Sequence, residues 1–588
     1  MGGHYILKIN NRCNMNCIFC ADSVESRREP DMSLEAIKEG LKKNSKSFDS
    51  LIITGGEPTI YKNLLYAIKY AKTCGFKWIS IATNGLLLSN KNIVERLYRA
   101  GVDSVQISYF ANDDRTFKAL SRTNLQNDLI DRAIRNAVEI GMTVRNNVVI
   151  NNLNYKQLPE IVEKLKGFGV SHINLAFMNP VGTSVINGRS ISALRFSDVM
   201  PYIRECVKIS RDGMLTLENF PLCVAGEFRE ILSDLMKPEE NQDYYNSAKH
   251  KPEECKGCIY YDECSGVWEA HLRQFGKGEI RPKYLEDMFK RYKYEISGIE
   301  AGVKKASILT VDAGAVDKYV KFLEKKSYHA LPSVFSFGIL DEKLRMDGNG
   351  MYSLYIAKER DAVEELKELD YYHQLKKPHP ELTPREIFYR IGSLLGYPGC
   401  CSRFLWGRKT RGEYYLMYNL SDCQYEDETI YPLMALKRSD SVSHLLNNFS
   451  FGFPKLIQFF VCNYECENAA KIAEKLLDYI KINHPDEYEL YKKELKRPIL
   501  FFSSHRFIRF DLKEKSDKIY YNEANFDETI TDRLGSEKSH NFLKIAKTFK
   551  EGNAFDIAKD KIVVYKDEKV LDTYQKKHKF DGIFIEFK

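Results

Sequence analysis

The sequence lacks any long hydrophobic run. No stretch approaches the ~20 apolar residues needed to span a bilayer, and the most apolar late segment, Phe449 to Cys462, is interrupted by Lys455. The first residues already follow the pattern of a strand, and they have neither the basic start nor the apolar core of a secretory signal. We therefore expect a cytoplasmic protein with no membrane partner.

The sequence also lacks a strong excess of one charge, internal repeats and low-complexity tracts. Its 588 residues include 88 Lys and Arg against 81 Asp and Glu, a formal net charge of +7, and 44% are hydrophobic. Such a composition is typical of a globular chain of about three to four domains. The mild positive excess permits an anionic substrate, but it argues against a dedicated nucleic-acid binder.

Cysteine is the residue whose pattern is informative. The chain has fourteen cysteines, and eleven of them fall into three groups with short internal spacings. In a long cytosolic chain such grouping indicates metal binding or redox chemistry rather than a disulfide framework.

The N-terminal third alternates apolar runs of strand length with amphipathic helical stretches. The expected strands are 4–9, 50–54, 78–83, 104–109, 143–150 and 172–177, and the expected helices are 33–44, 64–74, 90–100, 128–140 and 157–168. Ser33 is a good helix cap, and Gly75, Gly101 and Gly141 stand where helices should stop. Six such repeats predict an α/β fold, a partial (β/α)6 barrel over residues 1–215 with right-handed crossovers. Its site should lie at the carboxyl ends of the strands.

Three loops should meet at that rim. The loop after the first expected strand carries Cys13, Cys17 and Cys20 in the spacing CxxxCxxC. Three thiolates can hold three irons of a 4Fe–4S cubane and leave the fourth iron with an exchangeable position. That position can bind the amino and carboxylate groups of S-adenosylmethionine.

The neighbouring side chains suit such a ligand. Phe19 can cover the cluster or the adenine, and Gly55 and Gly56 allow close approach of the backbone. Glu57 offers a carboxylate for an ammonium group, and Asn84 can hydrogen-bond ribose or adenine.

CxxxCxxC after a first strand, with GGEP after a second, resembles the radical S-adenosylmethionine (SAM) superfamily over about residues 4–215. The resemblance implies reductive cleavage of SAM to methionine and a 5′-deoxyadenosyl radical that abstracts a substrate hydrogen. It implies Cys13, Cys17 and Cys20 as cluster ligands and residues 55–57 as contacts of the methionine moiety. Ser108 and Asn147 are further cofactor-binding candidates. The alternative is a zinc knuckle beside an unrelated α/β sheet, although no fourth cysteine or histidine follows closely after Cys20.

A second cysteine group falls in residues 216–283, which we expect to form a small auxiliary domain. Its members are Cys223, Cys255, Cys258 and Cys264. This group resembles the auxiliary-cluster extension called a twitch domain, which implies a second 4Fe–4S cluster on these four thiolates. From the spacing alone, a structural zinc ribbon is an equal alternative.

Residues 284–305 are expected to form a helical connector, and 306–588 an α+β domain with a cysteine-rich helical part over about 376–490. Thr383, Pro384 and Glu386 predict a helix start with a capping box. The third cysteine group follows, as Cys400 with Cys401 and Cys462 with Cys466.

Both pairs of this third group are expected at helix N-termini, where the backbone favours thiolate over thiol. Four thiolates brought together would suit a third metal centre. An iron–sulfur centre, zinc, redox-active or buried thiols, and a vicinal disulfide all remain open for this group.

The pattern as a whole predicts a radical SAM enzyme that abstracts hydrogen from a peptide or thiol-bearing substrate, with peptide modification or sulfur insertion as the outcome. One alternative is modification of RNA or a nucleotide-derived molecule. Another is a non-catalytic iron–sulfur carrier or scaffold. The enzyme would need an electron donor such as flavodoxin or ferredoxin.

Overall fold

The computed structural model describes the chain from residue 4 to 588 with gaps. The described ranges are 4–22, 28–178, 194–210, 213–235, 249–338, 344–346, 350–409, 435–436, 438–447, 456–457, 459–503, 506–516, 518–526, 537–576 and 582–588. The chain divides into two compact units, Met1–Lys283 and Tyr284–Lys588.

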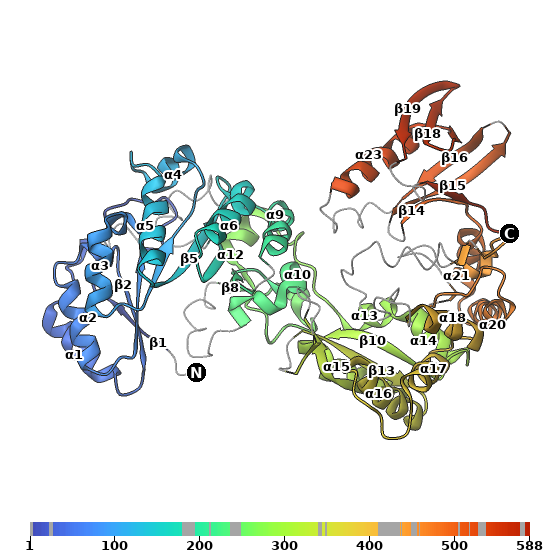
Figure 1. The fold of residues 1–588 in the computed structure, drawn as a ribbon, viewed down its shortest axis with the longest axis horizontal. Coiled ribbons are helices and arrows are strands. Elements are labelled where there is room, and N and C mark those ends of the chain that lie inside the picture. The colour runs from blue at the N-terminus through green and yellow to red at the C-terminus, as the bar shows by residue number, and fades with distance from the viewer. Residues whose placement is uncertain are drawn as a thin grey trace. The chain divides into compact units, whose positions relative to one another are not determined.

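The first unit is built on a seven-stranded sheet in which every neighbouring pair is parallel (Figure 1). The strands follow one another in chain order: β1 (His4–Lys8), β2 (Ser50–Thr54), β3 (Trp78–Thr83), β4 (Ser104–Ser108), β5 (Thr143–Ile150), β6 (His172–Phe177) and β7 (Leu215–Glu218). The six predicted strands are confirmed, but the predicted count is wrong by one. The missed strand β7 is four residues long, too short to show a clear pattern, and begins at the residue where the predicted barrel domain ends.

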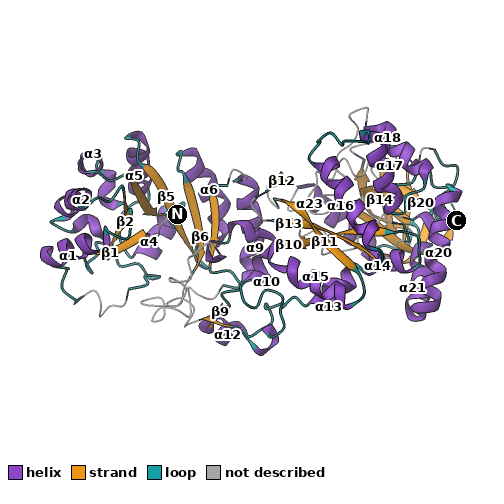
Figure 2. Ribbon diagram, turned by 90° about the horizontal axis from the view of Figure 1, so that it is seen from below, coloured by secondary structure: helices purple, strands orange, loops and turns teal. Residues whose placement is uncertain are grey.

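Helices connect these strands and pack along the sheet (Figure 2). They are α1 (Leu34–Asn44), α2 (Leu64–Thr73), α3 (Lys91–Ala100), α4 (Asp114–Ser121), α5 (Asp128–Glu139) and α6 (Leu158–Gly167), with short 3-10 helices at Pro58–Ile60, Leu86–Ser89 and Tyr155–Gln157. Ser33 caps α1 by accepting from the Ala36 N–H. Gly75, Gly101 and Gly141 have positive φ just after α2, α3 and α5, as predicted.

Alternate residues on β4 and β5 are buried and partly exposed, which separates two faces of the sheet. A Cβ on Gly85 would lie 2.9 Å from Ile107 Cγ2 and 3.6 Å from Ala133 Cβ, so the buried residue Ile107 of β4 faces α5. The partly exposed residues of these strands therefore lie on the opposite, inner face.

The remainder of the first unit is made of one longer helix, α9, and several short elements. They are α9 (Phe196–Ile209), α10 (Leu222–Ala225), α12 (Glu269–Phe275), the two-residue strands β8 (Lys249–His250) and β9 (Val267–Trp268), and 3-10 helices at Gly226–Ile231, Ser233–Leu235 and Glu253–Cys255. This region carries the second cysteine group.

The second unit opens with two helices and a four-stranded sheet. The helices are α13 (Leu285–Arg291) and α14 (Lys293–Glu300), where a helical connector is predicted. The sheet has the order β10-β13-β11-β12, from β10 (Ala306–Asp312), β11 (His329–Phe337), β12 (Leu344–Arg345) and β13 (Met351–Ala357). It packs with α15 (Val316–Lys325) and α16 (Arg360–Gln374), and a 3-10 turn spans Ala313–Ala315.

A helical part and a second sheet complete this unit. The helices are α17 (Pro384–Leu394), α18 (Gly399–Lys409), α20 (Glu467–Asn483) and α21 (Pro485–Leu495), with a 3-10 turn at His444–Leu446. The antiparallel sheet has the order β19-β18-β17-β16-β15-β14-β20. Its members are β14 (Ile499–Ser503), β15 (Arg506–Lys515), β16 (Ile519–Asn525), β17 (Ala554–Ile557), β18 (Lys561–Lys566), β19 (Lys569–Gln575) and β20 (Ile583–Ile585), and α23 (Glu537–Glu551) contacts it.

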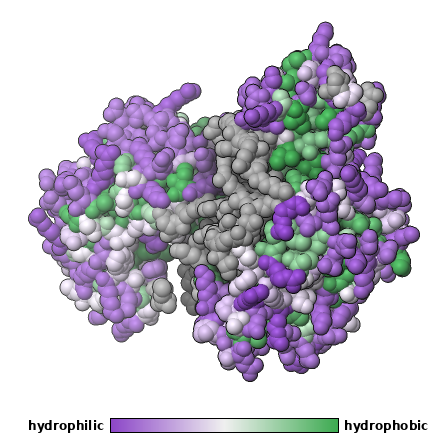
Figure 3. Space-filling view, turned by 45° about the vertical axis from the view of Figure 1, so that its right-hand side comes forward, coloured by the Kyte–Doolittle hydropathy of each residue, from purple (hydrophilic) through white to green (hydrophobic). Residues whose placement is uncertain are grey.

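Among the described residues, no helix combines the length and the apolar character that crossing a membrane requires. Where those residues reach the surface, the face drawn in Figure 3 is mainly hydrophilic, with smaller hydrophobic areas between.

The predicted capping box at the start of α17 is confirmed. The Thr383 N–H donates to Glu386 Oε2 at 2.8 Å, and the Glu386 N–H donates to Thr383 Oγ1 at 3.3 Å. The Thr383 hydroxyl, which donates to Glu386 Oε2 at 2.7 Å, and the Thr383 N–H together hold the pKa of Glu386 below its usual value.

Replacing Thr383 by alanine removes one of these acceptors. We expect Thr383→Ala to lower the free energy of unfolding by about 1 kcal/mol, measured by denaturant unfolding. Thr383→Ser keeps the acceptor and should cost little. Equal losses in the two variants would contradict this role of the cap.

Candidate functional site

The loops after β1 and β2 are joined backbone to backbone at the carboxyl ends of the strands. The Gly56 N–H donates to the Asn10 carbonyl at 2.9 Å, and the Glu57 N–H donates to the Arg12 carbonyl at 2.8 Å. In addition, Asn10 Nδ2 donates a hydrogen bond to the Glu57 carbonyl at 2.8 Å. The residues leading into the cysteine loop are therefore fixed against the GGEP loop.

Two glycines make this approach possible. A Cβ on Gly55 would lie 2.0 Å from Asn10 Oδ1, and a Cβ on Gly56 would lie 2.4 Å from the carbonyl oxygens of both Asn11 and Arg12. No side chain fits at either position without moving the cysteine loop. The close approach predicted for these glycines is observed here between two segments of the chain itself; their contact with a ligand remains a prediction.

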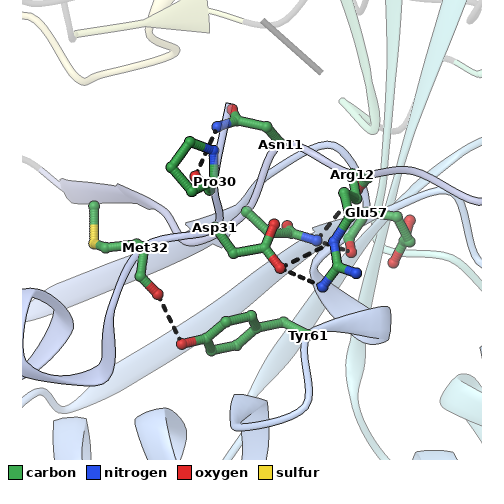
Figure 4. A network of polar contacts seen from close by, with 8 residues as sticks. Asn11, Arg12, Pro30, Asp31, Met32, Glu57 and Tyr61 are labelled. Carbon is green, nitrogen blue, oxygen red and sulfur yellow. Dashed lines mark hydrogen bonds and ion pairs between the residues drawn. The ribbon is translucent and has the colours of Figure 1, made fainter. Parts of the chain in front are cut away.

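A second set of contacts supports the other side of the same loop (Figure 4). Arg12 forms an ion pair with Asp31, and Asn11 Nδ2 donates to the Pro30 carbonyl at 3.4 Å. The Tyr61 hydroxyl donates to the Met32 carbonyl at 2.9 Å, which ties this support to the segment that follows the GGEP loop.

Glu57 is fully buried, and its carboxylate is used by the chain's own donors. Oε1 accepts from the Thr59 N–H at 3.0 Å and from the Thr83 hydroxyl at 2.7 Å, and Oε2 accepts from the Asn84 N–H at 2.7 Å. In this geometry Glu57 holds the second loop to the third, and its predicted contact with a ligand ammonium stays a prediction.

Asn84 reaches from the third loop to the first. Its Nδ2 donates to Asn14 Oδ1 at 2.7 Å and lies 3.7 Å from Cys13 Sγ, while its Oδ1 accepts from the Leu86 N–H at 3.1 Å. All three predicted loops are thus brought together, with Asn84 directed at a cysteine sulfur.

Cys13, Cys17 and Cys20 are half-buried, and none is in a disulfide. The Met15 N–H donates to Cys13 Sγ at 3.4 Å. Between the cysteines, the Ile18 N–H donates to the Leu120 carbonyl at 2.9 Å, which anchors the loop to α4. Thiolate donors with N–H groups directed at sulfur fit an iron–sulfur cluster.

Phe19 packs its ring against Phe110, with centroids 5.0 Å apart and an edge-to-face angle of 71°. This contact fixes the ring beside the loop that carries Cys17 and Cys20. Whether Phe19 covers a cluster or adenine stays a prediction.

A row of polar side chains crosses the inner face of the sheet, and only two of its members, Ser108 and Asn147, are predicted from the sequence. Ser108 pairs in register with Asn147, Asn147 with Asn174, and Asn174 with Thr216. Asn174 Nδ2 donates to Asn147 Oδ1 at 2.8 Å and to Glu218 Oε2 at 2.7 Å. The signal that could have found Asn174, Thr216 and Glu218 is polar residues at every second strand position on β6 and β7.

Arg145 and His172 form the next row of this face, paired in register on β5 and β6. Burial, with a further contribution from the Arg145 charge, lowers the pKa of His172 to about 4. Arg145 itself is exposed, and no carboxylate in the described part of the chain forms an ion pair with it. The inner face therefore presents the Arg145 cation together with neutral hydrogen-bonding groups and the Glu218 carboxylate, which accepts from Asn174.

The second cysteine group lies among the short elements at the end of the first unit. Burial raises the pKa of the Cys223 thiol to about 11, and the charges of Cys264, Cys255 and Cys258 act in the same direction. The Lys283 N–H donates to Cys258 Sγ and the Gly266 N–H to Cys264 Sγ, each at 3.4 Å. This donor set fits a cluster or a zinc ion.

The third cysteine group lies in the helical part of the second unit. Cys400 and Cys401 stand in the first turn of α18, and Cys466 is the N-cap of α20, as predicted; Cys462 precedes it in a loop. Their four sulfur atoms lie within 4.8 Å of one another.

The close approach at Gly56 can be tested directly. We expect Gly56→Ala to displace the cysteine loop, cost about 1–3 kcal/mol of stability and lower the iron retained after anaerobic reconstitution. Gly167→Ala is the matched control, because a Cβ there meets nothing within 4 Å. Iron retention in Gly56→Ala equal to wild type would contradict the prediction.

Comparisons with known proteins agree on the first unit. The family model described as Radical SAM superfamily matches residues 7–165. A protein named probable GTP 3′,8-cyclase from Saccharolobus islandicus is 30% identical over 217 residues, covering 36% of this chain and 68% of the relative. One of the same name from Sulfurisphaera tokodaii is 31% identical over 175 residues, covering 29% of this chain and 54% of the relative.

Among solved structures, Streptococcus suis SuiB bound to precursor peptide SuiA is similar with a TM-score of 0.34 and 18% identity, over 42% of this chain and 56% of that one. The family match covers the segment that carries the cysteine loop and the GGEP loop. The chain therefore belongs to the radical SAM superfamily, and it is an enzyme with a partial barrel of that type.

Proposed function

We propose that Cys13, Cys17 and Cys20 hold a 4Fe–4S cluster whose fourth iron binds SAM. When bound and reduced, this cluster supplies the electron that splits SAM into methionine and a 5′-deoxyadenosyl radical. The observation that carries the proposal is a loop with three half-buried thiols, fixed by backbone bonds to the GGEP loop.

The chain's own residues would then position SAM. Gly55 and Gly56 hold the cysteine loop in place, and Asn84 donates toward Cys13 and stands at the same rim. Phe19 would shield one side of the cluster, and Ser108 and Asn147 would bind from the inner face. The Met15 N–H, which donates to Cys13 Sγ, would orient this sulfur as a ligand.

We assign a second cluster to Cys223, Cys255, Cys258 and Cys264. Support comes from the charge interactions of Cys223 with the other three cysteines and from N–H donors at Cys258 and Cys264. Four cysteine ligands close a cubane, so such a cluster suits electron transfer better than substrate binding.

The inner face favours an anionic, hydrogen-bonding substrate of the nucleotide class. Arg145 provides an exposed cation, and the row Ser108, Asn147 and Asn174 provides amide and hydroxyl groups. The relatives named GTP 3′,8-cyclase agree with this class. The small net charge still argues against a large nucleic acid as substrate.

A peptide or thiol-bearing substrate, with peptide modification or sulfur insertion as the reaction, is the second candidate. It is favoured by the partial exposure of Cys255, Cys258 and Cys264, because an external thiol would have to displace one of the four cysteine ligands and these three are accessible. In either case the reductant would be a protein such as flavodoxin or ferredoxin.

The cluster assignment predicts the behaviour of a triple variant. Replacing Cys13, Cys17 and Cys20 together by alanine should abolish 5′-deoxyadenosine formation and remove about four irons per chain. Cys74→Ala, at the C-cap of α2, is the control and should change neither quantity. Continued SAM cleavage by the triple variant would overturn the assignment.

The substrate class predicts the behaviour of Arg145→Gln. GTP should stimulate 5′-deoxyadenosine formation by the wild type, and the variant should need at least ~10-fold more GTP because a charged contact is lost. Cleavage without substrate should be unchanged. Arg99→Gln on α3 is the control, since Arg99 is an exposed arginine paired with Glu95. Stimulation by a cysteine-containing peptide and not by GTP would favour the second candidate.

A further inference from the structure

The four cysteines of the third group come from three places along the second unit. Cys400 and Cys401 begin α18, Cys462 lies in the loop before α20, and Cys466 caps α20. Cys401 is fully buried, while Cys462 and Cys466 are each 7% exposed, so the sulfur atoms converge inside the core rather than on the surface.

The separations between these sulfur atoms decide how many metal ions they can share. Cys466 Sγ lies 3.6 Å from Cys400 Sγ and 3.9 Å from Cys401 Sγ, and no pair of the four exceeds 4.8 Å. Thiolates on one tetrahedral ion with bonds of about 2.3 Å stand about 3.8 Å apart. Thiolates on a cubane stand roughly 6 Å apart, because each binds a separate iron.

The separation between sulfur atoms also distinguishes the third cysteine group from the other two. Among the residues that the structure describes, no other three or more His, Cys, Asp and Glu side chains are gathered in this way. In the described structure, the spacing of a single-ion site is therefore found only in the third group.

Side-chain N–H groups lie close to these sulfur atoms, as expected for sulfur in the thiolate form. Asn468 Nδ2 lies 3.6 Å from Cys400 Sγ, and Asn463 Nδ2 lies 3.6 Å from Cys462 Sγ. N–H donors of this kind orient thiolates that bind metal, whereas buried thiolates without a cation would be costly.

We propose that Cys400, Cys401, Cys462 and Cys466 bind one zinc ion in a closed tetrahedral site. Zinc is favoured over a single ferrous ion because it stands higher in the order of affinities for such donors. With four protein ligands, the ion has no open position. It joins the N-terminus of α18 to that of α20 across a long stretch of chain, and it stabilises the hydrophobic core that contains Cys401, Tyr464 and Leu476.

This assignment sets the third group apart from the chemistry of the barrel. A closed zinc site neither transfers electrons nor supplies sulfide, so any inserted sulfur must come from elsewhere. The proposal is independent of the cluster on Cys13, Cys17 and Cys20: each can fail while the other stands.

The first test uses the wild-type full chain, purified without oxygen and reconstituted with iron and sulfide. We expect one zinc per chain by elemental analysis, with four sulfur neighbours at about 2.3 Å in X-ray absorption at the zinc edge. Absence of zinc, zinc bound mainly by nitrogen or oxygen, or iron in its place would overturn the proposal. Because no substitution is needed, this test does not depend on a variant folding.

The second test locates the ion. Cys400→Ala removes the one ligand of the four that is not buried, and we expect it to lose at least ~90% of the zinc while its iron content and SAM cleavage match wild type. Cys74→Ala is the matched control and should keep its zinc. Loss of about four irons from Cys400→Ala with zinc unchanged would instead assign a cluster to this group. Unchanged zinc and iron would show that these thiols hold no metal.

Discussion

The structure of the first unit depends on two hydrogen bonds between neighbouring loops, from the N–H groups of Gly56 and Glu57 to the carbonyls of Asn10 and Arg12. These two hydrogen bonds fix the backbone just before Cys13 and thereby position the loop that carries the three thiols. The bonds are possible only because Gly55 and Gly56 have no side chain, since a Cβ at either position would overlap Asn10 or the carbonyls of Asn11 and Arg12. The GGEP motif in this chain therefore serves first to position the cysteine loop. The buried carboxylate of Glu57 links this arrangement to the third loop by accepting hydrogen bonds from Thr83 and Asn84.

The chain carries three cysteine groups of similar composition that differ in geometry. The first places three cysteines on one loop, which under the proposed assignment would leave a corner of a cubane open for a small molecule. The second has four cysteines spread over residues 223–264, and the third has four whose sulfur atoms lie within 4.8 Å of one another. Under these proposals, the number and spacing of the thiols, rather than the residue type, would separate an open cluster, a closed cluster and a single-ion site.

Much of the first unit could be predicted from the sequence because its signals are local. Ser33 caps a helix, Gly75, Gly101 and Gly141 end helices, and the strands are apolar runs between them. The short strand β7 and the polar row through Asn174, Thr216 and Glu218 were missed, because β7 has only four residues and the row depends on the register between strands. The hydrogen bonds that join Glu57 to the third loop could not be predicted either, because no local feature of the sequence shows that its carboxylate faces Thr83. In the second unit the sequence could group the four cysteines but could not choose a metal, because that choice depends on distances between residues about sixty positions apart.

The central claim is that the fourth iron of the cluster on Cys13, Cys17 and Cys20 is left for SAM. The most direct measurement is electron–nuclear double resonance on the reduced enzyme with SAM that is isotopically labelled at its amino nitrogen and carboxylate. The account predicts that both labels couple to the cluster, and that the coupling disappears when these three cysteines are replaced. A reduced cluster whose spectrum shows no coupling to either label, at a SAM concentration that saturates cleavage, would contradict it.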